Sequence, residues 1–150
     1  MLKGIHPLLT PDLLKVMMEM GHDDALVLAD ANFTAASLAA GKPVIRLPGV
    51  SMCDTVTAVL SLLPLATDVA HPVAFMAISG QTNHYRSALQ REVMALLEPE
   101  LAANQSVEAI ERYAFYQRTR AAYAIVLTGE KQPFGNFLLR KGVIGENLQP

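Results

Sequence analysis

Hydrophobic positions along the chain alternate between helical spacing and short, continuous apolar runs. Residues 10–21 place leucine, valine and methionine side chains on one helical face, with Thr10 as the N-cap and Pro11 at the first helical position. Gly21 is the expected end of this helix. The apolar run at residues 25–29 has the length of a buried strand.

The same alternation continues to the end of the chain, without a repeat or a low-complexity linker. Strands are expected at residues 43–47, 73–79, 123–128 and 136–143, and helices at residues 52–63, 84–97 and 111–122. This order predicts an α/β fold, in which one compact domain over residues 1–150 has a central β-sheet flanked by helices.

Composition narrows the classes of partner. Lys and Arg number 12 against 14 Asp and Glu, which gives a net charge of -2 and no basic excess for binding nucleic acid. The chain is 51% hydrophobic and only 17% charged. With so few charged residues, a monomer would expose little polar surface. Self-association into a homo-oligomer is therefore expected.

No segment has the pattern of a targeting signal or a membrane anchor. The first residues carry Pro7 and Pro11, which interrupt the apolar core that a signal peptide needs. The longest stretch without Asp, Glu, Lys or Arg, residues 69–85, is broken by polar residues and glycine. The single cysteine, Cys53, has no partner for an internal disulfide. A cytoplasmic protein without membrane contact is expected.

Motifs of the common enzyme classes are absent from the sequence. There is no glycine-rich dinucleotide loop, no P-loop, no HExxH zinc motif and no GxSxG nucleophile motif. Cys53 lies in an apolar helical segment, which favours core packing over nucleophilic chemistry. His6, His71 and His84 lack metal-ligand spacing and are interpreted as surface or structural residues.

His22 and Asp30 flank the expected strand at residues 25–29 and form the candidate catalytic pair. Histidine can supply and recover a proton near neutral pH, and a carboxylate can orient it or accept hydrogen bonds from a substrate. Each residue also has a structural interpretation. His22 could bond a carbonyl at the preceding helix end, and Asp30 could cap the following turn.

Two long stretches resemble the D-ribose pyranase and L-fucose mutarotase family. They are "LKGIHPLLTPDLLKVMMEMGHDDALVLADANF" and "IERYAFYQRTRAAYAIVLTGEKQPFGNFLLRKGV", in the same order as in the family. The second stretch has an Arg-aromatic-x-Phe-Tyr run before a Thr-Gly-Glu turn, which is closer to the fucose branch than to the ribose branch.

The resemblance implies an isomerase that interconverts anomers or ring forms of a free monosaccharide, most simply L-fucose. Such a reaction moves two protons and requires no metal, nucleophile or redox cofactor. By the same resemblance the protein forms a ring-shaped homo-oligomer, often a decamer, in which a neighbouring subunit completes each pocket. The implied proton donor is His22, and the implied sugar-binding residues are Asp30, Arg112, Phe134, Gly135 and Asn136.

The chain departs from the family pattern at two positions. Phe134 stands where tyrosine is common, so one phenol is missing, and Tyr113, Tyr116 and Tyr123 are the candidates to replace its hydroxyl. Asn32 stands where some members carry histidine, although Asn is also familiar in the fucose branch. The sequence therefore predicts an L-fucose mutarotase, with a D-ribose pyranase or a non-catalytic sugar-binding or regulatory protein as alternatives.

Overall fold

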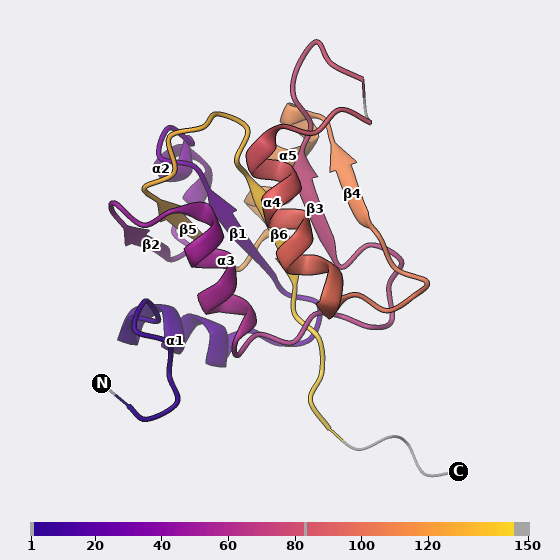
Figure 1. The fold of residues 1–150 in the computed structure, drawn as a ribbon. Helices are drawn as coiled ribbons and strands as arrows, with labels where there is room; N and C mark the ends of the chain where they lie inside the picture. Colours follow the sequence, from indigo (N-terminus) through magenta and orange to yellow (C-terminus); the bar gives the residue numbers. More distant parts are fainter. Residues whose placement is uncertain (1, 83, 146–150) are drawn as a thin grey trace.

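The computed structural model describes residues 2–82 and 84–145. The elements, in chain order, are α1 (Pro11–Glu19), β1 (Ala25–Ala29), α2 (Ala35–Ala39), β2 (Val44–Leu47), α3 (Met52–Leu60), β3 (Val73–Met76), α4 (Ala88–Leu97), the 3-10 helix η1 (Glu98–Glu100), β4 (Val107–Ile110), α5 (Arg112–Ala121), β5 (Ala124–Thr128) and β6 (Phe137–Arg140). Helices and strands alternate over most of this order, so the predicted α/β class is confirmed (Figure 1).

One six-stranded sheet runs through the molecule in the order β2-β5-β1-β6-β3-β4. The neighbouring pairs are parallel except where β6 lies between β1 and β3, antiparallel to both. Because β6 runs backwards, its first residue lies beside the last residues of its two neighbours. The start of β6 and the carboxyl ends of β1 and β3 therefore meet at one edge of the sheet.

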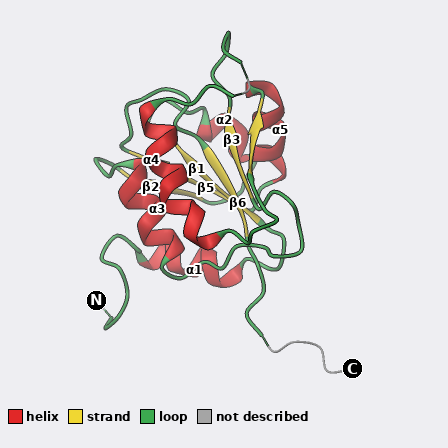
Figure 2. Ribbon diagram, turned by 45° about the vertical axis from the view of Figure 1, so that its right-hand side comes forward, coloured by secondary structure: helices red, strands yellow, loops and turns green. Residues whose placement is uncertain are grey.

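Helices cover both faces of the sheet (Figure 2). α1, α3 and α4 lie on one face, while α2 and α5 lie on the other. Alternate side chains of β1 follow this division: Leu26 and Leu28 pack in the core beneath the first group, and Val27 and Ala29 in the core beneath the second. A strand buried on both faces has no polar positions, which explains the continuous apolar run at residues 25–29.

Side-chain caps determine where the longer helices begin. The Thr10 and Ser51 hydroxyls accept hydrogen bonds from Leu13 N (3.2 Å) and Asp54 N (3.1 Å), so α1 and α3 start as predicted. The helix expected at residues 84–97 starts only at Ala88, because the capping hydroxyl comes from Ser87.

The sequence-based prediction missed three short elements, α2, η1 and β4. α2 has five residues and no side-chain cap, and β4 is a four-residue edge strand whose side chains are mostly half-buried. The strands expected at residues 73–79 and 136–143 are shorter, ending at Met76 and spanning Phe137–Arg140. None of the helices in the described ranges is long and apolar enough to cross a bilayer.

Candidate functional site

A pocket of about 210 Å³ opens at the sheet edge where β1 and β3 end and β6 begins. Ligand sites of open α/β sheets characteristically lie beyond the carboxyl ends of the parallel strands. The polar side chains of the pocket come from three separate parts of the chain. They are Asp30 and Asn32 after β1, Arg112 at the start of α5, and Asn136 before β6.

Asp30 and Asn136 form a buried pair at the base of this pocket. Asn136 Nδ2 donates to Asp30 Oδ2 (2.8 Å), and Asp30 N donates to Asn136 Oδ1 (2.9 Å). Only 3% and 2% of the two residues is exposed. The antiparallel register of β1 and β6, which pairs Leu28 with Phe137, brings together residues 106 positions apart in the chain. Because the two residues are buried and joined by two hydrogen bonds, their side chains hold one geometry.

The Asp30 carboxyl group is surrounded by N–H donors yet remains poorly solvated. Asn32 N donates to Oδ1 (3.0 Å), and Gly135 N also bonds the carboxylate. Burial nevertheless raises the pKa of Asp30 above its ordinary value, an effect that Glu130 adds to and that these hydrogen bonds only partly oppose. A carboxylate with a raised pKa is a better proton acceptor at neutral pH than an ordinary aspartate.

The turn before β6 adopts a backbone conformation that is unusual for its residues. Phe134 has a φ of 63°, in the left-handed region that non-glycine residues rarely adopt. A Cβ on Gly135 would lie 2.8 Å from Leu89 Cδ2 and 3.1 Å from the Gln132 carbonyl oxygen, so a larger residue would displace the Leu89 side chain of α4. Backbone conformations of this kind persist only where the surrounding structure holds them in place. They are found mostly at binding and active sites.

Gln90, on α4, supports this turn through side-chain hydrogen bonds. Its Nε2 donates to the Phe134 carbonyl (3.1 Å) and to the Met76 carbonyl at the end of β3 (3.0 Å), and the residue is fully buried. No sequence motif identifies Gln90 as a residue of the site. The usable signal was the Ser87-x-x-Gln90 spacing of a capping box, which marks the helix start but not the two carbonyls.

Arg112, which the family resemblance implies as a sugar-binding residue, lines the same pocket. Its Nη2 donates to the Tyr113 hydroxyl (2.8 Å), and its guanidinium carbon lies 4.7 Å from the centre of the Tyr113 ring. Within residues 2–82 and 84–145, the buried Nε of Arg112 has no hydrogen-bonding partner. Arg112 therefore brings a positive charge and an unused N–H donor to the pocket.

His22 lies at the opposite edge of the sheet. Its Nε2 contacts the Asp68 carboxylate at 3.1 and 3.2 Å, and 46% of its side chain is exposed. The extended chain of β1 separates His22 from Asp30, which at about 3.3 Å per residue places them roughly 20 Å apart. One chain thus brings Asp30, Arg112, Phe134, Gly135 and Asn136 together, but not His22.

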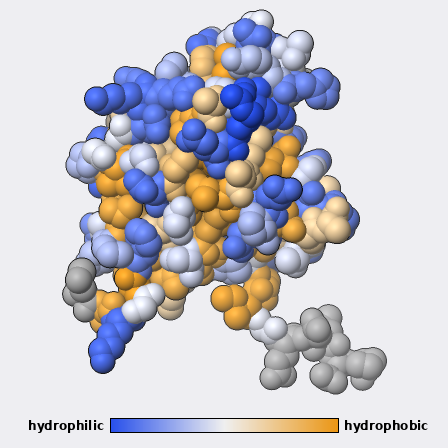
Figure 3. Space-filling model, in the orientation of Figure 1, coloured by the Kyte–Doolittle hydropathy of each residue, from blue (hydrophilic) through white to orange (hydrophobic). Residues whose placement is uncertain are grey.

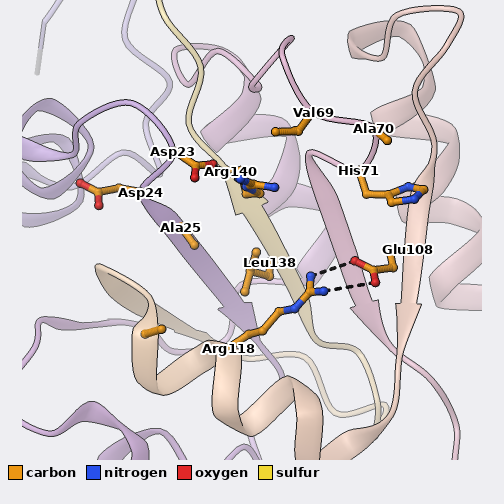
Figure 4. A pocket seen from close by; sticks show the side chains of 11 residues that line it. Asp23, Asp24, Ala25, Val69, Ala70, His71, Glu108, Arg118, Leu138 and Arg140 are labelled. Carbon is orange, nitrogen blue, oxygen red and sulfur yellow. Dashed lines mark hydrogen bonds and ion pairs between the residues drawn. The ribbon is translucent and has the colours of Figure 1, made fainter.

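A larger groove, of about 490 Å³, also lies at the edge near His22 (Figure 4). Its charged side chains are largely paired with one another. Arg118 of α5 holds Glu108 of β4 through two hydrogen bonds (2.9 and 3.2 Å), and Arg140 holds Asp23. Because these charges are largely paired, and because none of the carboxylates that line the groove in the described part of the chain is buried, we place the candidate site at Asp30 despite the smaller volume.

Comparisons with known proteins agree with the fold and with the resemblance in the sequence. Residues 3–144 match the model of the RbsD / FucU transport protein family. An L-fucose mutarotase from Actinobacillus pleuropneumoniae serotype 5b (strain L20) is 40% identical over 144 residues, which are 95% of this chain and 97% of the relative.

Solved structures of both branches have the same fold. The fucose mutarotase from Streptococcus pneumoniae, in complex with L-fucose, matches with a TM-score of 0.86 at 37% identity, over 96% of this chain and 100% of that chain. Bacillus subtilis RbsD, complexed with D-ribose, matches with a TM-score of 0.74 at 25% identity, over 97% and 100%. The predicted resemblance, including its fucose side, is confirmed. This chain belongs to the RbsD / FucU transport protein family.

Proposed function

We propose that this protein is an isomerase that interconverts the anomers of free L-fucose by general acid–base opening and closure of the sugar ring. The observation that carries the proposal is the Asp30–Asn136 pair, a buried and pre-positioned carboxylate in a pocket of sugar-like size. The similarity to L-fucose mutarotases over 95% of the chain supports the substrate.

The reaction requires little beyond two positioned proton-transfer groups. One proton leaves the anomeric hydroxyl while another reaches the ring oxygen, which breaks the bond between C1 and the ring oxygen. The open aldehyde then rotates about the bond from C1 to C2 and closes on its other face. Asp30, Arg112 and the segment 134–136 hold the sugar, and the raised pKa of Asp30 also makes its carboxylate a suitable acceptor for the anomeric proton.

The apolar half of the pocket favours L-fucose over D-ribose. Phe33, Met76 and Phe134 line the pocket together with its polar side chains. L-fucose carries a methyl group on its ring, which can be buried against such a wall, while D-ribose has no comparable group. Burial of one methyl group favours binding by about 0.8 kcal/mol, or roughly fourfold in affinity.

We further propose that His22 of a neighbouring subunit completes each pocket within a ring-shaped homo-oligomer, a decamer. The distance between His22 and Asp30 within one chain supports this arrangement. The surface also supports association, because Val143 and Ile144, which adjoin His22, are 69% and 83% exposed. In Figure 3, apolar surface is visible in the middle of the face formed by α3 and α4 and beside the grey C-terminal residues.

Saturation-transfer NMR on free sugars tests the proposed function. Irradiation of one anomeric proton of L-fucose should reduce the signal of the other anomer in the presence of the protein. Faster exchange with D-ribose than with L-fucose would instead identify a D-ribose pyranase. Binding of L-fucose without faster exchange would identify a non-catalytic sugar-binding or regulatory protein. The proposed location is the cytoplasm, where free monosaccharides are metabolised.

A further inference from the structure

We infer that Tyr116 is a sugar-contacting residue of this pocket, whose hydroxyl forms a hydrogen bond with the bound monosaccharide. The inference rests on the proposed function and adds to its sugar-binding residues one of the three tyrosines that the sequence offered as a replacement for the hydroxyl missing at Phe134. It is carried by the position of the side chain, the fixed orientation of its ring and the absence, among the described residues, of a partner for its hydroxyl.

Tyr116 lies on α5 one turn after Arg112, and residues four apart on a helix share a face. Both side chains line the Asp30 pocket. Two edge-on contacts hold the half-buried Tyr116 ring, one with Phe33 (5.7 Å between ring centres, 72° between planes) and one with Tyr113 (6.0 Å, 89°). The ring thus has little freedom to move when a ligand enters.

The Tyr116 hydroxyl has no hydrogen-bonding partner within residues 2–82 and 84–145, and it is not among their fully buried polar atoms. The hydroxyls of the other two candidate tyrosines already have hydrogen-bonding partners. The Tyr113 hydroxyl accepts from Arg112, and 61% of Tyr113 is exposed. The Tyr123 hydroxyl donates to Glu19 of α1 (3.3 Å). Of the three, Tyr116 alone brings an unused hydroxyl to the pocket.

A hydroxyl at Tyr116 complements the other polar groups of the pocket, which include the side-chain amide of Asn32. The Asn136 amide is committed on both sides to Asp30, and Asp30 accepts from Asn32, Asn136 and Gly135. Ionised Asp30 offers only acceptor positions, and Arg112 offers only donors. A phenol both donates and accepts, so Tyr116 is suited to a sugar hydroxyl or the ring oxygen. Phe134 lines the same pocket without a hydroxyl of its own.

The test is the affinity of Tyr116→Phe for L-fucose, measured by isothermal titration calorimetry. The substitution removes one oxygen and keeps both ring contacts. We expect affinity to fall roughly two- to tenfold, the effect of one lost hydrogen bond, with no fall in thermal stability. Tyr123→Phe, which removes the hydroxyl near Glu19, is the matched control and should bind as wild type does.

A double-mutant cycle with Phe134→Tyr separates sugar contact from a structural effect. If the pocket lacks one phenol in Tyr116→Phe, adding Phe134→Tyr should recover most of the lost affinity, and this gain should exceed the gain from Phe134→Tyr in the wild-type background. Wild-type affinity in Tyr116→Phe would overturn the inference, as would equal effects of Phe134→Tyr in both backgrounds. A wild-type protein that neither binds L-fucose nor speeds its exchange would overturn the proposed function itself.

Discussion

Mixing two inactive variants should restore activity if each pocket takes residues from two subunits. His22→Ala removes the proposed proton donor, and Asp30→Asn removes the carboxylate while keeping its size. Alone, each variant should exchange the anomers of L-fucose about 100-fold more slowly than wild type, or more slowly still. The two changes lie at opposite edges of the sheet, so neither should disturb the other residue.

The expected recovery follows from the geometry. Roughly 20 Å of chain separates His22 from Asp30, whereas a proton transfer requires contact at about 3 Å, so one chain cannot supply both residues to one sugar. In a randomly assembled 1:1 mixture, about a quarter of the pockets combine an intact Asp30 with an intact His22 from the neighbour. Exchange should then return to about a quarter of the wild-type rate.

The assay is saturation-transfer NMR on L-fucose after the two variants have been dissociated together and reassembled. The control replaces the Asp30→Asn chain with a chain that carries both substitutions, so that no pocket can regain His22. Mixtures that stay as slow as their parents, with hybrid oligomers verified by native mass spectrometry, would refute the shared pocket. Full activity in a stable wild-type monomer would refute it as well.

Three further predictions concern the Asp30 carboxyl group, the support of the turn before β6, and a close backbone contact elsewhere in the fold. The folded chain raises the pKa of Asp30 above the ordinary 3.8, so protonated Asp30 stabilises the folded state. This contribution to the unfolding free energy is complete below pH 3.8 and is lost as pH rises through the raised pKa. Urea unfolding across this pH range should show the loss of this contribution in wild type but not in Asp30→Asn. Gln90→Leu leaves the carbonyls of Met76 and Phe134 without this donor and should lower the unfolding free energy by about 1–3 kcal/mol, with weaker L-fucose binding in calorimetry. Gly129→Ala would place a Cβ 2.4 Å from Gly49 N and should lower the melting temperature by several degrees in calorimetric scans, unlike Gly21→Ala, whose nearest contact is 3.6 Å.

The fold class was predictable because its main signals are local. The apolar run of β1 and the capping residues Thr10 and Ser51 determine their elements within a few neighbouring residues. β4 was not predictable in this way, since a short, half-buried edge strand acquires its conformation by pairing with β3. The insertion of β6 between β1 and β3 is likewise a product of long-range pairing.

The site was predictable only in part, and mainly through the family resemblance. Asp30 and Asn136 become neighbours through the antiparallel register of β1 and β6, which no local pattern encodes. Gln90 acts through its side-chain amide on the carbonyls of distant residues, and any residue type can supply a carbonyl. That the Tyr116 hydroxyl lacks a partner among the described residues is apparent only when the partners of all nearby groups are known.

The separation of His22 from Asp30, in contrast, was already present in the sequence. Both residues were identified by their position at the two ends of one apolar run, and that run was interpreted as a strand. A strand rises about 3.3 Å per residue, so residues at its opposite ends cannot meet over one monosaccharide. A catalytic role for both residues therefore requires either that the run is not a strand or that two chains share the site. The structure establishes β1 as the strand Ala25–Ala29, so a catalytic role for His22 in the Asp30 pocket requires a second copy of the chain.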